Sequence, residues 1–443
     1  MKSNDIVRAA IRLTGVSVLS KSLYYLYQVS LTHLVGSNML GMIHLITPIY
    51  YTTLSFLTAG FAQAICRLTA ENWASHNYFI LNAIYSRVNR LFKTLFFVIL
   101  LPFCFTIVFY VRSTVHSLRL LPILVLIPFL LFCTAQEIFQ KQAFYGINNL
   151  TIPSVLQITE QLVRMFAILG VLLLLPHREP TTVVFIVFAG MLVSEIYSSL
   201  HLKMLRKRQM ISIPLSQLHR QQPPSETPKD ILRIVLPVSI TTMIGQSIGT
   251  LNANILPYLL TQSGMTYADA LSAYGILCGT TIPLLTLPTS LTSSLSIILL
   301  PNLSGHRARE DASAFSHTLG FCLKLTFLLV TPLTFLLACL SPVIGRLLYH
   351  HNDMGTAILP LSLCVILSAF EDLFATALNA CDRQTANATV TFLSALLQII
   401  LTIGFTPSMG MTGYVISLLL STLLGALLRL IVLLRMRYAR VDL

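Results

Sequence analysis

Apolar segments of about 20 residues recur along almost the whole chain, and they limit it to one kind of fold. A helix needs about 20 apolar residues to cross the ~30 Å hydrocarbon core of a bilayer. Charged residues make up only 10% of the chain, whereas soluble domains carry about 25%. The sequence therefore predicts an all-α polytopic membrane protein with about twelve transmembrane helices.

Short polar breaks separate these segments, and the basic start of the chain lacks the small-residue cleavage site of a signal peptide. We therefore expect the first helix to be retained. The predicted helices cover residues 10–33, 41–65, 91–111, 121–140, 152–175, 182–203, 233–260, 270–299, 318–341, 355–379, 388–406 and 412–434.

The basic residues indicate the topology. The formal net charge is +13, but the Lys and Arg residues lie in alternate loops and form no single patch, so nucleic acid is not an expected partner. The loops expected outside hold only a few of them, namely Arg112, Arg119, Arg178 and Arg346. The positive-inside rule then predicts a multi-pass protein of the cytoplasmic (plasma) membrane with both termini in the cytoplasm.

The chain divides into two similar halves. A basic, Pro- and Ser-rich segment predicts a cytoplasmic linker at 204–231 between a six-helix lobe at 1–203 and another at 232–443. The run EIFQKQAFYG that begins at Glu137 parallels EDLFATALNA, which begins at Glu371. Because each half has an even number of helices, we expect two parallel lobes around a central cavity.

Three ionisable residues fall near the middle of predicted helices, where charge is costly and commonly functional: Lys21, Glu160 and Arg164. Glu160 and Arg164 are spaced to pair on one helix face. With Lys21 they give this level of the N-terminal lobe a net charge of +1, which favours an anionic ligand such as a diphosphate. The alternative is a structural Glu–Arg pair with Lys21 extending toward the interface.

Other polar residues in the spans are weaker candidates. Tyr24 and Gln28 lie near Lys21 and could hydrogen-bond sugar hydroxyls. The C-terminal lobe offers only Gln398 at the level aligned with Arg164. Four acids are expected nearer the cytoplasmic helix ends, namely Glu137, Glu195, Glu371 and Asp372. Pro48 is expected to bend the second predicted helix, and Pro283 and Pro288 the eighth.

Catalytic and cofactor motifs are missing from the sequence. It contains no Gly-rich phosphate loop, HExxH motif or CxxC pair. Its one GxSxG run, at 245–249, falls inside the predicted helix 233–260 and not on the strand-to-helix turn of a nucleophile elbow. We therefore expect a transporter rather than an enzyme, without a metal or cofactor. An energy source such as an H⁺ or Na⁺ gradient is left open.

Three stretches resemble the stage V sporulation protein B and polysaccharide-flippase branch of the MOP superfamily, which also includes lipid II flippases and MATE exporters: residues 20–71, 144–169 and 283–304. The resemblance implies two six-helix bundles that carry an undecaprenyl-diphosphate-linked saccharide or cell-wall precursor across the membrane by alternating access. It places the family's helix-five motif on Gln157, Glu160, Gln161 and Arg164, and its helix-one basic residue on Lys21. Expected partners are the lipid-linked saccharide, membrane lipids and cell-wall or polysaccharide synthesis enzymes.

The chain also departs from the family pattern. Gln28 stands where a second basic residue is common, and twelve helices are expected here where lipid II carriers often have fourteen. These departures weigh against lipid II itself as the substrate. A MATE-like exporter of small cations, coupled to Na⁺ or H⁺, is the alternative function. A membrane polysaccharide polymerase or ligase is a third and less favoured function, because such enzymes need a large outward-facing loop and the outside loops expected here are short.

Overall fold

The computed structural model describes residues 3–74, 81–114, 121–147, 149, 151–175, 179–211, 228–308, 311–349, 358–381 and 383–438. All regular structure in these ranges is helical. Nine of the described helices are long and apolar enough to cross a membrane. The predicted all-α membrane fold is confirmed.

The first half of the chain forms seven long helices: α1 (Ser3–Val35), α2 (Ser37–Ala74), α3 (Leu81–Thr114), α4 (Leu121–Gly146), α5 (Thr151–Leu174), α6 (Pro180–Ile211) and α7 (Pro228–Gln262). The rest forms α8 (Tyr267–Ile276), the π-helical turn η4 (Leu277–Thr281), α9 (Ile282–Leu285), α10 (Thr289–Ala308), α11 (Ala312–Tyr349), α12 (Ile358–Ala380), α13 (Gln384–Met409) and α14 (Met411–Tyr438).

The predicted single helix at 270–299 is broken into α8, η4, α9 and α10. Two prolines account for the breaks. Proline has no backbone N–H to continue the helical ladder and its ring clashes with the preceding turn. The π-helical turn comes directly before Pro283, and α9 ends before Pro288. Pro48 lies inside α2, which continues through it.

The helices form two compact units. Unit 1 contains residues 1–46 and 247–443, and unit 2 contains residues 47–246. These limits do not coincide with the predicted lobes at 1–203 and 232–443, because α1 packs against α10 and the first part of α7 belongs to unit 2. Most of the predicted linker, residues 212–227, lies outside the described residues.

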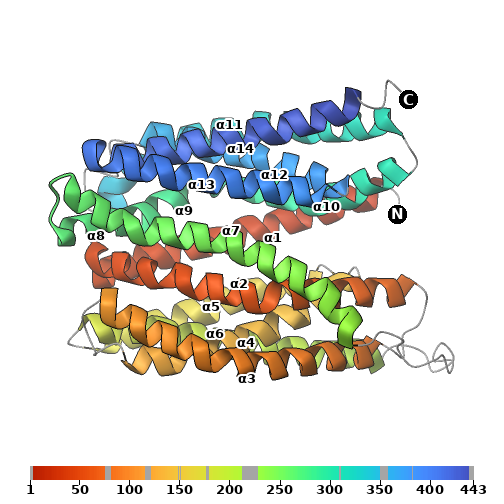
Figure 1. Ribbon diagram of the computed structural model, residues 1–443, viewed down its shortest axis with the longest axis horizontal. Helices are drawn as coiled ribbons and strands as arrows, with labels where there is room; N and C mark the ends of the chain where they lie inside the picture. Colours follow the sequence, from red (N-terminus) through yellow and green to blue (C-terminus); the bar gives the residue numbers. More distant parts are fainter. Residues whose placement is uncertain are drawn as a thin grey trace. The chain divides into compact units, whose positions relative to one another are not determined.

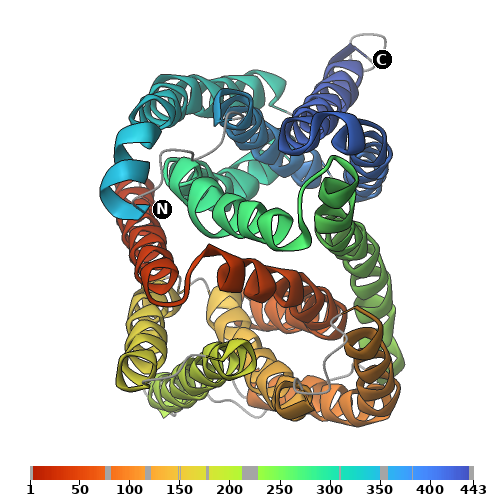
Figure 2. The ribbon, with the colours of Figure 1, turned by 90° about the vertical axis from the view of Figure 1, so that its left-hand side faces the viewer.

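In unit 1, α11, α12, α13 and α14 run alongside one another (Figure 1), and Figure 2 shows the same helices nearly end-on. Small and branched apolar residues fill the space between α8, α12 and α14. In unit 2, α4 and α5 both pack on α6. Aromatic rings from α2, α3 and α4 meet edge to face, with Phe92 and Phe139 centroids 4.8 Å apart. These packed bundles position the charged side chains described next.

Candidate functional site

The Glu160–Arg164 pair expected on α5 is present. The guanidinium Nη2 of Arg164 donates to Glu160 Oε1 at 2.7 Å, across one helical turn. Leu156, Ile168 and Leu172, on the same helix, are buried. This packing turns the face that carries the pair toward the other helices of unit 2, as the spacing of four residues predicts.

Side chains from α4 and α6 extend the pair into a network. Arg164 also donates to Glu195 Oε1 at 2.9 Å and, through Nε, to Ser194 Oγ at 3.1 Å. Lys141 contacts Glu160 Oε2 at 3.1 Å and forms a second ion pair with Glu137. The network therefore joins three helices, because Glu137 and Lys141 lie on α4, the original pair on α5, and Glu195 on α6.

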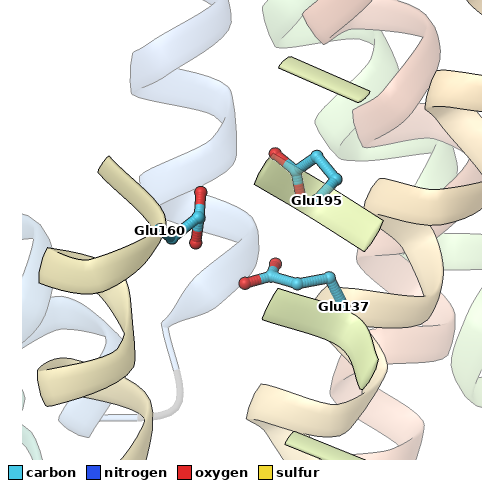
Figure 3. A group of neighbouring side chains, drawn as sticks. All are labelled: Glu137, Glu160 and Glu195. Atoms are coloured by element: carbon cyan, nitrogen blue, oxygen red, sulfur yellow. The ribbon is translucent and has the colours of Figure 1, made fainter. Parts of the chain in front are cut away.

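The three carboxylates of this network lie within 4.8 Å of one another and turn toward a common point (Figure 3). All three glutamates are buried. Three carboxylates and two cations give the network a formal charge of −1. Within the described residues, Glu195 Oε2 is buried and has no hydrogen-bond partner. Carboxylate oxygens suit a hard monovalent or divalent cation, but two cationic side chains already occupy this cluster.

The net charge differs from the expected +1, and the structure gives the reason. The expected sum counted Lys21, whose hydrogen bonds to Thr286 and Thr289 lie within unit 1. The sequence-based sum also omitted Lys141 and assigned Glu137 and Glu195 to the helix ends. Counting those three side chains changes the sign of the charge around Arg164.

Lys21 contacts the break between α9 and α10. Its Nζ donates to Thr289 Oγ1 at 3.0 Å and to the backbone oxygen of Thr286 at 3.4 Å. The Thr286 carbonyl, just past the end of α9, also accepts the backbone N–H of Thr289 at 3.2 Å and its hydroxyl at 2.8 Å, so Lys21 adds a third donor to this turn. A cation at a helix C-terminus also complements the helix dipole. Lys21 thus stabilises the broken helix.

The polar residues expected near Lys21 and Arg164 also belong to different units. Gln28 is buried on α1 and donates to the Tyr24 hydroxyl at 2.6 Å. Gln161 is buried on α5, and within the described part of the chain its Nε2 has no hydrogen-bond partner. Gln157 is exposed on α5. Of the residues expected to form one site, Lys21, Tyr24 and Gln28 therefore belong to unit 1 and the others to unit 2.

Unit 1 has a buried charge network of its own, outside the stretch aligned with Arg164 in which only Gln398 was expected. Arg429 on α14 is 4% exposed and pairs with Glu371 on α12. It also donates to Asn387 Oδ1 and Thr391 Oγ1 on α13, each at 2.7 Å. Three helices of unit 1 are thereby joined through one guanidinium group.

The two networks occupy corresponding positions in the sequence repeat. The register that aligns Glu137 with Glu371 also aligns Glu195 with Arg429, since the members of each pair are separated by the same number of residues. The aligned position on the last helix therefore carries an acid in one half and a base in the other. In this register both networks include the acid at Glu137 or Glu371, but the last helix contributes the acid Glu195 to one network and the base Arg429 to the other.

Sequence reasoning missed Lys141 and Arg429. Lys141 lies four residues after Glu137, a spacing that favours an ion pair on a helix and could have identified it. Arg429 precedes other basic residues at the end of the last apolar run, so its position is also typical of the Lys and Arg residues that flank a helix on the cytoplasmic side. Only the packing of α12, α13 and α14 distinguishes it from them.

Solved structures with the same fold come from the MOP superfamily. An outward-facing multidrug resistance MATE family transporter matches with a TM-score of 0.68 and 13% identity over 100% of this chain and 99% of the other. The inward-facing form matches with 0.69 and 15% over 98% and 99%. A MOP superfamily transporter from Pyrococcus furiosus matches with 0.69 and 13% over 100% and 99%. At these identities the likeness establishes the fold.

Sequence comparison supplies the family. Stage V sporulation protein B from Bacillus subtilis (strain 168) is 21% identical over 442 residues, which is 97% of this chain and 83% of that protein. The family model described as lipid II flippase MurJ matches residues 154–441, well over half of the chain. The resemblance expected from residues 20–71, 144–169 and 283–304 is confirmed. The chain belongs to the lipid II flippase MurJ family.

Proposed function

We propose that this flippase-family protein moves an undecaprenyl-diphosphate-linked saccharide or cell-wall precursor across the cytoplasmic membrane by alternating access. Membership of the flippase family and the similarity to the sporulation protein support a lipid-linked substrate. The observation that carries the proposal is the buried cluster around Arg164 in a membrane-spanning bundle. Buried charges inside a membrane are expensive and commonly mark the path of a polar substrate. Transport of this kind involves no covalent chemistry.

Arg164 is the group we assign to the diphosphate. Its guanidinium is held by two carboxylates, and its side chain is 14% exposed. A diphosphate offers several charged acceptor oxygens in the planar geometry that a guanidinium prefers. We infer that the substrate displaces Glu195 from Arg164, while Glu160 keeps the guanidinium oriented.

Lys21 supplies a second phosphate contact in this proposal, and Gln28 and Tyr24 supply hydrogen bonds to the saccharide. Lys21 holds the broken segment between α9 and α10. A phosphate that drew its ammonium away would remove one donor from the turn at Thr286 and Thr289, whose own hydrogen bonds to each other remain. Substrate binding would thereby change the break in this segment, which is the kind of element that can bend during alternating access.

The experiment is reconstitution into liposomes with fluorescent undecaprenyl-diphosphate saccharides and measurement of leaflet exchange. We expect exchange by the wild type and at least a tenfold lower rate for Arg164→Ala. Lys21→Ala should also be slower. Arg435→Ala is the matched control, because Arg435 is an exposed arginine near the end of α14. Equal exchange by wild type and Arg164→Ala would refute the assigned site.

A second function is favoured by one observation. A MATE-like exporter of small cations would use an acidic site, and the network around Arg164 has a formal charge of −1. Efflux of a cationic dye from the same liposomes, driven by a Na⁺ or H⁺ gradient and lost in Glu195→Gln, would support that function. No exchange of any lipid-linked saccharide by folded protein would point the same way.

We also propose that both termini lie in the cytoplasm, from the uneven distribution of Lys and Arg between loops. Reporter fusions at residue 443 and within the loop at 176–178 test this orientation. The terminal fusion should report the cytoplasm and the loop fusion the outside. The reverse result would invert the proposed topology.

A further inference from the structure

Unit 1 contains a pocket apart from both charge networks. Its cavity volume is about 310 Å³, at the lower end of the ~300–1,000 Å³ typical of small-molecule sites. Its walls come from α11, α12, α14 and the last turn of α10. In Figure 1 the end of α14 lies at the same end of unit 1 as the start of α11.

The lining is suited to hydrocarbon. Phe315, Leu319 and Leu323 on α11 face Phe374 on α12 and Leu433 on α14. The floor is the cluster of buried residues that includes Leu303 and Ala377, against which several lining side chains pack. A cavity with these walls has few groups that could hold ordered water. In a bilayer, an apolar chain is its natural occupant.

Gly320 lines this pocket and is not needed for close packing. A Cβ built at Gly320 meets no atom within 4 Å, so the space in front of it is open. Glycine inside a helix costs about 1 kcal/mol relative to alanine. Here the missing side chain enlarges the cavity and brings no helix nearer.

The pocket lining contains two charged residues. Arg307 in the last turn of α10 donates to the backbone oxygen of Ala380 at 3.4 Å. Asp311 is the other charged lining residue, and its Oδ1 accepts the backbone N–H of Ala314 at 2.8 Å as a helix cap. An apolar pocket with one arginine in its lining complements a hydrocarbon chain that ends in an anionic group.

We propose that this α11–α14 pocket binds the phosphate-proximal isoprene units of a polyprenyl diphosphate carrier, with Arg307 beside the phosphate. The rings of Phe315 and Phe374 are both in the lining and offer apolar faces to flat, methyl-branched isoprene units. The pocket is too small for the whole tail, so it anchors the part nearest the headgroup. This inference rests on the proposed function, because it assigns a tail site to the lipid-linked substrate.

Photo-crosslinking tests the pocket. The full chain in nanodiscs is mixed with undecaprenyl diphosphate that carries a diazirine on its phosphate-proximal isoprene units, and labelled peptides are identified by mass spectrometry. We expect labels on the pocket segments of α11, α12 and α14. Gly320→Phe should lower labelling about tenfold, which corresponds to about 1.4 kcal/mol of binding free energy. Gly320→Ala, which adds one methyl group to open space, is the matched control.

Ser316→Phe is the second variant, in case Gly320→Phe does not fold. Ser316 lines the pocket and is exposed, so a ring there narrows the mouth and leaves the core intact. Unlabelled undecaprenyl diphosphate should compete for the label, and phosphatidylglycerol should not. Labelling that folded filling variants retain, or that phosphatidylglycerol removes equally, would overturn the proposal.

Leaflet exchange measured on the same proteins separates this proposal from the proposed function. Exchange by wild type together with no label in the pocket would refute the tail site and leave the flippase function standing. Pocket labelling with no exchange of any lipid-linked saccharide would support the tail site and count against the flippase function.

Discussion

Replacing Arg429 with methionine tests whether the buried network of unit 1 stabilises the protein. Arg429 is 4% exposed and makes contacts to Glu371, Asn387 and Thr391 on two neighbouring helices. Methionine keeps the length and apolar stem of the side chain but removes the charge and every donor. The substitution therefore leaves a carboxylate and two polar acceptors without their partner.

The expected cost follows from the partners. Removing one member of a buried ion pair typically costs about 3–5 kcal/mol, because the other charge stays buried. The Glu371 side chain is 20% exposed, so it regains part of its hydration. We therefore expect a loss of about 3 kcal/mol, at the lower end of that range. The double variant Arg429→Met/Glu371→Gln leaves no unpaired charge, so its loss in free energy of unfolding should be only about 1–2 kcal/mol.

The assay is reversible unfolding of the purified protein in mixed micelles, followed by tryptophan fluorescence or circular dichroism, for both single variants and the double variant. A coupling energy of at least about 1 kcal/mol between Arg429 and Glu371 is the expected result. Two outcomes would refute the reasoning. One is a loss below about 0.5 kcal/mol in Arg429→Met, typical of a surface substitution. The other is a double variant that is as unstable as the sum of the single variants.

Three further predictions concern the helix contacts. Glu195→Gln should leave stability unchanged or higher because it neutralises a network of formal charge −1, whereas Lys141→Met should cost about 3 kcal/mol because it raises that charge to −2. Gly425→Ala should cost about 1–3 kcal/mol because its Cβ would collide with the Glu371 carboxylate. Gly60→Ala should cost as much because its Cβ would meet a backbone oxygen of α7. Thermal unfolding in detergent measures each change.

Gly170→Ala is the control for both glycine variants. A Cβ at Gly170 meets no atom within 4 Å, so alanine should raise stability by up to about 1 kcal/mol through helix propensity alone. Equal effects at Gly60 and Gly170 would contradict the close contact of α2 with α7. Similar losses for Glu195→Gln and Lys141→Met would contradict the count of charges around Arg164.

Much of the fold could be predicted because the bilayer imposes a simple rule. A backbone inside hydrocarbon must satisfy its own hydrogen bonds, so each long apolar run becomes a helix. The interruption at Pro283 and Pro288 was predictable for a related reason, since proline cannot donate to the helical ladder. The Glu160–Arg164 pair is local to one helix turn, and its spacing alone predicted it.

Contacts between helices were beyond the sequence. Lys21 and Arg164 were expected in one site because both lie at a similar depth, and depth gives no information about which helix lies opposite. The hydrogen bond from Lys21 to Thr289, 268 residues further along the chain, could therefore not be predicted. The predicted sum of charges left out the partners of Arg164 and Glu160 on α4 and α6 for the same reason.

The sequence by itself determined the helical membrane fold and the family, because these depend on apolar length, spacing and residue order. Only the tertiary structure decided which charges meet. Lys141 joins Glu160 across two helices, and Arg429 joins Glu371, Asn387 and Thr391 across three. The physical reason is that a buried ion pair requires its partners within about 4 Å, a distance set by helix packing and not by position in the chain.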